Sequence, residues 1–252
     1  MTGMKDSVHT EYLKSLASKR SLPELPWKDR TVIVVGSDGK LNVGAMVAMQ
    51  VAGKGGMVIE GDKFDFKETA FRSMIDQATD LVICCASVHM AWIEDITETD
   101  IYRVTYDTLI APMNYTSMFA EGLMEAPHRK HIVFIGSMAH SKVLNASSIY
   151  CSAKAGLAHY ARCAAWELTA KGFTIGTVHP GNIEGTPMTE DTIEGIAAYR
   201  NISLDEARDY WASAKLTDKW LKPREVADEV MHLLTSTPHH SGVQVELAGG
   251  MR

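Results

Sequence analysis

Short runs of β-branched and aliphatic residues alternate with helix-forming segments along most of the chain, and this alternation constrains the fold more than any other feature. Thr31-Val-Ile-Val-Val35 has apolar or β-branched residues at consecutive positions, as in a strand that is covered on both faces. Further strands are expected at 57–60, 81–85, 131–136, 173–179 and 243–247. Helices are expected at 44–52, 68–77, 100–124, 150–171, 189–215 and 223–236. The pattern therefore predicts an α/β fold with a doubly wound parallel sheet and right-handed crossovers.

The length and charge of the chain limit its organisation and its partners. With 252 residues, of which 46% are apolar, it can bury a full core, and we predict one domain over 31–252 with a helical and extended appendage over 1–30. A net charge of −6 without a basic stretch disfavours nucleic acid as a partner. No apolar run approaches the ~18 residues of a membrane span. The polar start of the chain has no signal-peptide apolar region, so we expect a cytoplasmic protein that does not bind membranes.

The cysteines do not have the spacing of a metal or redox site. They fall inside predicted strands or helices and form no C-x-x-C pair. The residues are Cys84, Cys85, Cys151 and Cys163. We expect buried, reduced thiols and no bound metal.

Tyr150 and Lys154 lie four residues apart, so a helix places both side chains on one face. An ammonium group beneath a phenol lowers the pKa of the phenol, which makes the tyrosine a usable proton carrier near neutral pH. Ser137 follows the apolar run 131–136 and could donate a hydrogen bond to the same substrate oxygen. The combination predicts redox chemistry between carbonyl and alcohol groups, although Y-x-x-x-K alone is also typical of ordinary surface helices.

The order of these features resembles the short-chain dehydrogenase/reductase family from about Thr31 to Gly250, with a strand before Ser137, the Tyr150 helix, another strand and then a Pro-Gly dipeptide. The resemblance implies a single-domain Rossmann-type fold and a small-molecule alcohol or ketone substrate. It also implies that Tyr150 is the general acid/base and that Ser137 orients the reacting carbonyl or hydroxyl. Lys154 would lower the pKa of the phenol and bind the nicotinamide ribose.

A glycine-rich loop, Gly36 to Gly44, joins the first strand to its helix, where family members bind a dinucleotide pyrophosphate. The loop departs from the family pattern T-G-x-x-x-G-x-G, because it is longer and Asn42 stands for the middle glycine. A glycine-rich connection without a ligand is the alternative. Besides Tyr150 and Lys154, the implied cofactor contacts are Gly36, Ser37, Asn42, Val43, Asp62, Asp65, Ala86, Pro180, Gly181, Ile183 and Thr186.

Charged residues after the second strand bear on the choice of cofactor. Asp62 can accept hydrogen bonds from an adenosine ribose and repel a 2′-phosphate, which favours NAD(H). Lys40 and Lys63 flank the same region and could accommodate NADP(H), while Glu60 and Asp62 could also be ordinary solvated charges. We therefore expect NAD(H), with NADP(H) as the alternative.

The region around the third strand is shortened. The interval between residues 60 and 81 is too short for the helix, strand and further helix that the family places there. Phe64-Asp65-Phe66 is the expected remnant of that strand, and Asp65 matches the position that contacts adenine in the family. The adenine side of the cofactor site would then be altered.

Many family members use an asparagine of the long helix to hold a water in a proton relay below the lysine. Thr108 occupies that position in the present chain. A hydroxyl can bind water but lacks the reach of an amide, so the resemblance implies a modified relay through Thr108.

The helix expected at 150–171 is rich in small residues that would allow close contact between helices. They are Ala153, Ala155, Gly156, Ala158, Ala161, Ala164 and Ala165. In the family this helix, the helix at 100–124 and the last strand pair between subunits. The resemblance implies a homotetramer, with a dimer as the alternative.

The sequence is compatible with two functions. The first is an NAD(P)-dependent oxidoreductase acting on a secondary alcohol or ketone, with residues 188–216 covering the substrate as in the family. The second is a catalytically weak dinucleotide-binding scaffold or sensor, which the irregular glycine loop, the shortened third-strand region and Thr108 favour. Retention of Ser137, Tyr150 and Lys154 together favours the enzyme.

Overall fold

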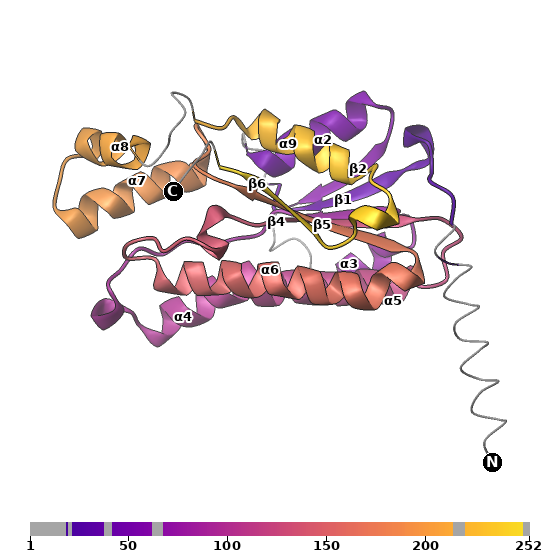
Figure 1. Cartoon of the computed structure of the whole chain (residues 1–252), viewed down its shortest axis with the longest axis horizontal. Helices are drawn as coiled ribbons and strands as arrows, with labels where there is room; N and C mark the ends of the chain where they lie inside the picture. Colours follow the sequence, from indigo (N-terminus) through magenta and orange to yellow (C-terminus); the bar gives the residue numbers. More distant parts are fainter. Residues whose placement is uncertain (1–18, 20–21, 38–41, 62–67, 214–219, 249–252) are drawn as a thin grey trace, which may run out of the picture.

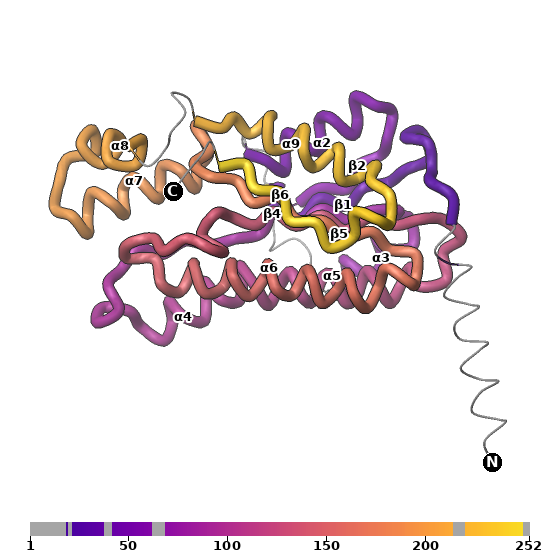
Figure 2. Tube along the Cα trace, viewed as in Figure 1, coloured from indigo at the N-terminus to yellow at the C-terminus, as the bar shows by residue number. Residues whose placement is uncertain are grey.

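A computed structural model describes residues 19, 22–37, 42–61, 68–213 and 220–248. Within these residues six parallel strands form one sheet in the order β2-β1-β3-β4-β5-β6 (Figures 1 and 2). The strands are β1 (Thr31–Val35), β2 (Met57–Gly61), β3 (Asp80–Ile83), β4 (Lys130–Ile135), β5 (Phe173–Pro180) and β6 (Val243–Leu247). The sheet order reverses at β1, which pairs with β2 on one side and β3 on the other. The predicted α/β, doubly wound parallel sheet is confirmed.

Helices cover both faces of the sheet (Figure 1). They are α2 (Val43–Gly53), α3 (Glu68–Ile75), α4 (Glu98–Thr105), α5 (Ala111–Gly122), α6 (Ser148–Leu168), α7 (Pro187–Arg200), α8 (Leu204–Ala212) and α9 (Pro223–Leu233). Val32 and Val34 of β1 pack in the cluster that includes residues of α2 and α9. Ile33 and Val35 pack in the opposite cluster, with residues of α3, α5 and α6. Successive residues of a strand thus enter different layers, which explains the continuous apolar runs.

The helix expected at 100–124 is interrupted by a π-helical turn, Tyr106–Ile110, between α4 and α5. In this turn the Ala111 N–H donates to the carbonyl of Tyr106, one residue further back than in an α-helix. Pro112 follows and has no N–H to donate to the carbonyl of Thr108, so the regular ladder is broken at this point. The turn contains Thr108 and determines where its side chain points.

The helical stretch expected at 189–215 forms two helices, α7 and α8, beyond the carboxyl ends of the strands (Figure 1). Asn201 ends α7 in the left-handed conformation, with φ 55°. Ser203 then starts α8 with a capping box, in which its side chain and that of Glu206 satisfy each other's backbone N–H groups. These local signals separate the two helices.

The small residues of α6 mostly face the core of their own chain. Ala153, Ala158, Ala161, Ala164 and Ala165 are buried. A Cβ atom on Gly156 would lie 3.1 Å from the Leu109 side chain, whereas Ala155 is exposed. The small side chains therefore allow α6 to approach the sheet and the π-helical turn, and do not form an outward stripe.

The structure describes only part of the region between β2 and β3, which the sequence predicts to be shortened. β2 ends at Gly61 and α3 begins at Glu68, and within the described residues β2 pairs with β1 alone. Asp62, Lys63 and the expected strand remnant Phe64-Asp65-Phe66 lie outside the described residues. Lys40 in the glycine-rich loop also lies outside them.

The cysteines differ from the expectation of uniformly buried thiols. Cys85 is buried, Cys84 and Cys151 are half-buried, and Cys163 is exposed. Cys163 lies on the outer side of α6, because the buried side of this helix is made by the alanines. Among the helices of the described segments, none has the length and apolar content needed to span a bilayer.

A buried cluster of charged and polar groups joins the amino ends of three strands. The Arg30 guanidinium donates to Asp80 at 2.9 and 3.0 Å, and the His131 backbone N–H donates to Asp80 at 2.9 Å. The side chains of Asp80 and His131 are fully buried. Burial raises the pKa of Asp80, but His131, Arg30 and Thr79 outweigh it and hold this pKa below 3.8.

We expect Asp80→Asn to lower the free energy of unfolding by about 3–5 kcal/mol, because the change removes a carboxylate from buried Arg30. The lowered pKa of Asp80 means that its stabilisation is present above the unfolded-state pKa and is lost as the pH falls through the folded-state value. Denaturant titration across acidic pH measures both effects, and the variant should lack this contribution to the acid dependence.

Glu121→Gln is the matched control, because its ion pair with Arg72 joins side chains that are 68% and 45% exposed. We expect a loss below about 1 kcal/mol for this variant. Equal losses in the two variants would contradict a role for buried charge in stability.

Candidate active site

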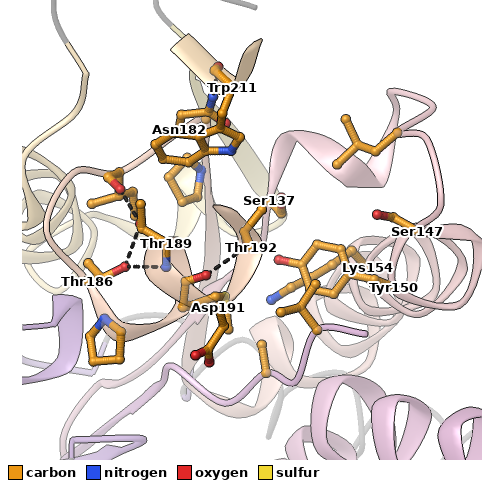
Figure 3. A pocket seen from close by; sticks show the side chains of 18 of the residues that line it. Ser137, Ser147, Tyr150, Lys154, Asn182, Thr186, Thr189, Asp191, Thr192 and Trp211 are labelled. Atoms are coloured by element: carbon orange, nitrogen blue, oxygen red, sulfur yellow. Dashed lines mark hydrogen bonds between the residues drawn. The ribbon is translucent and has the colours of Figure 1, made fainter. Parts of the chain in front are cut away.

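A cavity of about 760 Å³ lies at the carboxyl ends of the strands. It is next to β1 and β3, the neighbouring strands at which the order of the sheet reverses. Doubly wound proteins bind ligands at such a position. Its lining includes many of the predicted site residues, namely Gly36, Asn42, Val43, Ala86, Ser137, Tyr150, Lys154, Pro180, Gly181, Ile183 and Thr186. In Figure 3, Ser137, Tyr150 and Lys154 approach the cavity from one side, and α7 residues face them from the other.

Ser137 is held immediately after β4 at the start of a 3₁₀ turn, Met138–His140. Its Oγ accepts a hydrogen bond from the Ala139 N–H at 3.1 Å. This contact uses a lone pair and leaves the hydroxyl proton available for an oxygen in the cavity. The strand end therefore orients Ser137 as a donor.

Tyr150 and Lys154 project from the first turns of α6, and both side chains are buried. The Lys154 Nζ donates to the carbonyl oxygen of Ile135 at 2.8 Å and lies 5.8 Å from the centre of the Tyr150 ring. This hydrogen bond ties α6 to the end of β4, next to Ser137. The expected convergence of the three side chains is therefore present in the geometry.

The pKa of Tyr150 moves opposite to the sequence-based expectation. Burial raises it to about 12, hydrogen bonding with Ser137 lowers it, and the neighbouring Cys151 thiol raises it. Desolvation disfavours the phenolate, and the Lys154 ammonium is directed toward the Ile135 carbonyl. The expected acidification of the phenol is thus not found, and Tyr150 is protonated at neutral pH.

Lys154 also shifts toward its neutral form. Burial lowers its pKa to about 8, against the opposing influence of the Cys85 and Cys84 thiols. Burial raises the pKa of Cys84 to about 12, so this cavity-lining thiol stays protonated. A lysine with a pKa of about 8 still carries its positive charge on most molecules at neutral pH.

The described ends of the glycine-rich loop bring backbone close to the cavity. Gly36 has φ +90°, and a Cβ atom there would lie 2.9 Å from the Cys84 carbonyl carbon. A Cβ atom on Gly44 would lie 3.0 Å from the Gly36 oxygen. Asn42 caps α2 by accepting from the Ala45 N–H at 2.8 Å. Asn42, which we expect to stand for the middle glycine of the family pattern, is therefore a helix cap.

Two predicted site residues make other contacts. Ser37 is buried and its hydroxyl donates to the Glu60 carboxylate at 2.7 Å, so its side chain does not line the cavity. Thr108 is fully buried, accepts from the Ser87 N–H at 3.1 Å and donates to the Ser87 oxygen at 3.3 Å. The π-helical turn directs the Thr108 hydroxyl to this loop backbone, outside the cavity lining.

The segment after β5 forms the wall opposite Tyr150. Thr186 caps α7 by accepting from the Thr189 N–H at 3.2 Å, and the two hydroxyls lie 2.8 Å apart. Thr189 in turn donates to the Ile183 oxygen. The predicted Ile183 and Thr186 are thereby joined in one hydrogen-bonded turn, with Pro180 and Gly181 before it.

Several cavity residues were not among the predicted site residues. They are Gly44, Cys84, Cys85, Val88, Met90, Ile135, Gly136, Leu144, Asn145, Ser147, Asn182, Pro187, Met188, Thr189, Asp191, Thr192, Ile196, Tyr199, Tyr210, Trp211 and Ser213. The residues from α7 and α8 fall in the segment that the family resemblance assigns to substrate. Val88, Met90 and Leu144 come from loops without a local sequence signal, because only their position beside the strand ends brings them to the cavity.

Comparisons with known proteins agree with this architecture. A family model described as short chain dehydrogenase matches residues 62–197, more than half of the chain. A Streptomyces coelicolor protein, provisionally named a ketoacyl reductase, is 27% identical over 143 residues. The match covers 56% of this chain and 51% of the relative, so it spans about half the length of that protein.

Solved structures with the same fold have low sequence identity to this chain. The ligand-free aldohexose dehydrogenase of Thermoplasma acidophilum has a TM-score of 0.75 and 18% identity, covering 89% of this chain and 94% of its own. A variant of actinorhodin polyketide ketoreductase, solved with NADPH, has a TM-score of 0.77 and 16% identity, covering 89% and 97%. The family match and the shared fold show that this chain belongs to the short-chain dehydrogenase family of oxidoreductases, whose fold implies a nicotinamide cofactor.

Proposed function

We propose that the protein interconverts a ketone and a secondary alcohol with a nicotinamide cofactor. The observation that carries this proposal is the convergence of Ser137, Tyr150 and Lys154 on one cavity that also reaches the glycine-rich loop. A proton donor, a hydrogen-bond donor and a cation beside a cofactor-sized space are the groups that this reaction needs.

The cavity residues fit a dinucleotide. The amino end of α2 and the side-chain-free Gly36 and Gly44 offer backbone to a pyrophosphate. Ala86, Pro180, Gly181, Ile183 and Thr186 would line the nicotinamide end, and Lys154 would bind the adjoining ribose. When bound, the cofactor supplies or accepts the hydride.

The side chains have separate tasks in this proposal. Ser137 donates a hydrogen bond to the ketone oxygen, and Tyr150 gives its phenolic proton to that oxygen as the carbonyl carbon gains hydride. The product is the secondary alcohol, and the phenolate left on Tyr150 is stabilised by the Lys154 charge until it regains a proton. A phenol with a pKa of about 12 is in the protonated state that reduction requires. Thr108 is outside this path because its hydroxyl is bound to Ser87.

Apolar side chains in the cavity lining favour an apolar substrate. They include Val88, Met90, Leu144, Ile196, Tyr199 and Trp211. Among the described lining residues, Lys154 and Asp191 are the charged ones, so a substrate anion would meet little positive charge beyond Lys154. The ketoacyl reductase name of the Streptomyces relative is consistent with ketone reduction.

Tyr150→Phe should lower kcat for ketone reduction by about 10²–10⁴-fold, because it removes the proton donor. NADH and NADPH affinities, measured by fluorescence titration, should stay close to those of the wild type. Tyr160→Phe is the matched control on the same helix, since Tyr160 does not line the cavity. We expect this control to keep wild-type activity.

The same assay separates the enzyme from the scaffold or sensor. Tight cofactor binding without turnover of any ketone or alcohol in a broad panel would support the scaffold. Full activity of Tyr150→Phe would also contradict the proposed proton transfer.

We further propose NAD(H) as the preferred cofactor. Glu60, near the carboxyl end of β2, accepts a hydrogen bond from Ser37 of the glycine-rich loop and so places a carboxylate beside the expected adenosine ribose. A negative charge there repels the 2′-phosphate of NADP(H). A carboxylate at Asp62, which the sequence predicts to bind the ribose, would also favour NAD(H) over NADP(H).

NADH should therefore bind more tightly than NADPH, and Glu60→Gln should reduce the difference by about threefold to tenfold. The amide can still accept from Ser37, so the change removes charge with little change of shape. Glu167→Gln, at an exposed position of α6, is the control. Tighter binding of NADPH by the wild type would overturn the choice of NAD(H).

We also propose a homo-oligomer, with a tetramer favoured over a dimer. Apolar side chains are exposed along α4, the π-helical turn and α5, and on α6. They are Ile101, Tyr102, Tyr106, Ile110, Met113 and Trp166. Trp166 is 89% exposed, which is unusual for a large apolar side chain in the absence of a partner.

Trp166→Glu should shift the protein toward smaller species in light scattering, because the contact would have to bury a charge. Leu204→Glu is the control, since Leu204 is 50% exposed and belongs to α8, a helix that lies away from α4, α5 and α6 (Figure 1). A wild-type protein that is monomeric at micromolar concentration would contradict the proposed assembly.

A further inference from the structure

Two histidines stack next to Ser137. The ring centres of His140, in the 3₁₀ turn after β4, and His179, in β5, are 3.8 Å apart with 29° between the ring planes. The His140 Nδ1 lies 2.8 Å from the Ser137 carbonyl oxygen. The Ser137 N–H points to the His179 Nδ1 at 3.3 Å. The two imidazoles thus contact both backbone polar groups of one residue.

The hydrogen bonds beyond the pair determine which nitrogen of His179 carries the proton. Gln244 in β6 donates through Nε2 to the Thr177 hydroxyl at 3.2 Å, so its Oε1 remains as an acceptor. This Oε1 lies 2.6 Å from the His179 Nε2, which must therefore carry a hydrogen. Neutral His179 then presents the lone pair of Nδ1 to the Ser137 N–H.

The absence of a side chain at Gly136 makes room for the His179 ring. A Cβ atom on Gly136 would lie 2.3 Å from the His179 Nδ1, closer than any side chain could be placed without movement. His179 is completely buried, and the His140 side chain is 12% exposed. Gly136, Ser137 and His140 from one segment thus enclose His179 from another, which limits the movement of the Ser137 peptide.

We propose that His140 and His179 are positioning residues that orient Ser137 toward the reacting oxygen, His140 by donating to its carbonyl and His179 by accepting from its N–H. Neither ring lines the cavity, so the pair acts through Ser137. The consequence for turnover rests on the proposed function, whereas the hydrogen-bond arrangement can be tested without it.

Protonation would change what His179 offers to Ser137. A proton on Nδ1 removes the acceptor of the Ser137 N–H and directs a donor at the Ser137 carbonyl oxygen, 3.1 Å away, where His140 already donates. The two histidines should therefore orient Ser137 at neutral pH and no longer do so at acidic pH.

Charged and titratable groups on each side determine this titration. Burial holds the pKa of His179 below 6.5, hydrogen bonding to Gln244 raises it, and His140 and Lys154 lower it. From β6, Glu246 faces the outer nitrogen of His140, with Oε1 3.6 Å from Nε2. His140 disfavours a positive charge on the neighbouring His179.

Kinetics of three variants test the effect on turnover. His140→Ala should lower kcat by about threefold to tenfold with little change in KM or in cofactor affinity, because it removes one hydrogen bond that orients Ser137. His140→Asn should recover most of this loss, since an amide N–H can replace the Nδ1 donor. His239→Ala, at an exposed histidine of the turn Pro238–His240, should retain wild-type values.

His179→Asn should remove the acid limb of the kcat profile, because the amide oxygen can accept from the Ser137 N–H without titrating. Should this buried change prevent folding, the His140 variants and the NMR measurements below decide the question. A kcat of His140→Ala equal to that of the wild type would overturn the proposal. So would a loss that His140→Asn does not recover.

NMR tests the arrangement independently of activity. Long-range ¹H–¹⁵N spectra should show neutral His179 as the Nε2–H tautomer, and the Ser137 amide signal should follow the His179 titration below pH 6.5. His140→Ala should move the Ser137 amide signal, and His239→Ala should not. A His179 proton on Nδ1, or a Ser137 signal that does not respond, would overturn the positioning role.

Wild-type protein that turns over no ketone would contradict the proposed function and the consequence for kcat. The tautomer and the Ser137 amide signal would still decide whether the pair holds this residue.

Discussion

The alignment of parallel strands at a common edge is the constraint on which the rest of the structure depends. Ser137 follows β4, Ala86 lies shortly after β3, and Gly36 follows β1, so their proximity requires that these strands end together. At the opposite ends, Asp80 of β3 is bonded to Arg30 and His131, which precede or begin the neighbouring strands. Buried polar contacts at one edge thus accompany the alignment that builds the cavity at the other.

Burial governs the electrostatics of the cavity. Desolvation raises the pKa of Tyr150 and lowers that of Lys154, so both groups shift toward their neutral forms. The chemistry proposed for reduction needs a protonated phenol at the start, which burial favours, and a cation nearby at the end. The Lys154 Nζ donates to the Ile135 carbonyl and lies 5.8 Å from the centre of the Tyr150 ring.

The interactions of Ser137 extend into the sheet. Its hydroxyl is oriented locally by the Ala139 N–H, whereas its peptide groups contact His140 and His179. Gln244 of β6 continues this series of hydrogen bonds to the edge of the sheet. The orientation of one side chain at the cavity is therefore linked to three strands, which gives a physical reason for changes in β6 to affect the site.

The sequence by itself determined the order of helices and strands, because apolar periodicity and caps act over a few residues, and it placed Tyr150 and Lys154 on one face of α6 through helical pitch. Only the tertiary structure decided how buried these groups are, where the Thr108 hydroxyl points, and that His140 stacks on His179. The pKa of Tyr150, the hydrogen-bond partner of Thr108 and the stacking of His140 on His179 depend on segments that are distant in the chain. No local sequence pattern indicates how close these segments come in the fold. The sign of the Tyr150 shift is the clearest example, since spacing indicates the neighbouring charge but not the loss of water that outweighs it.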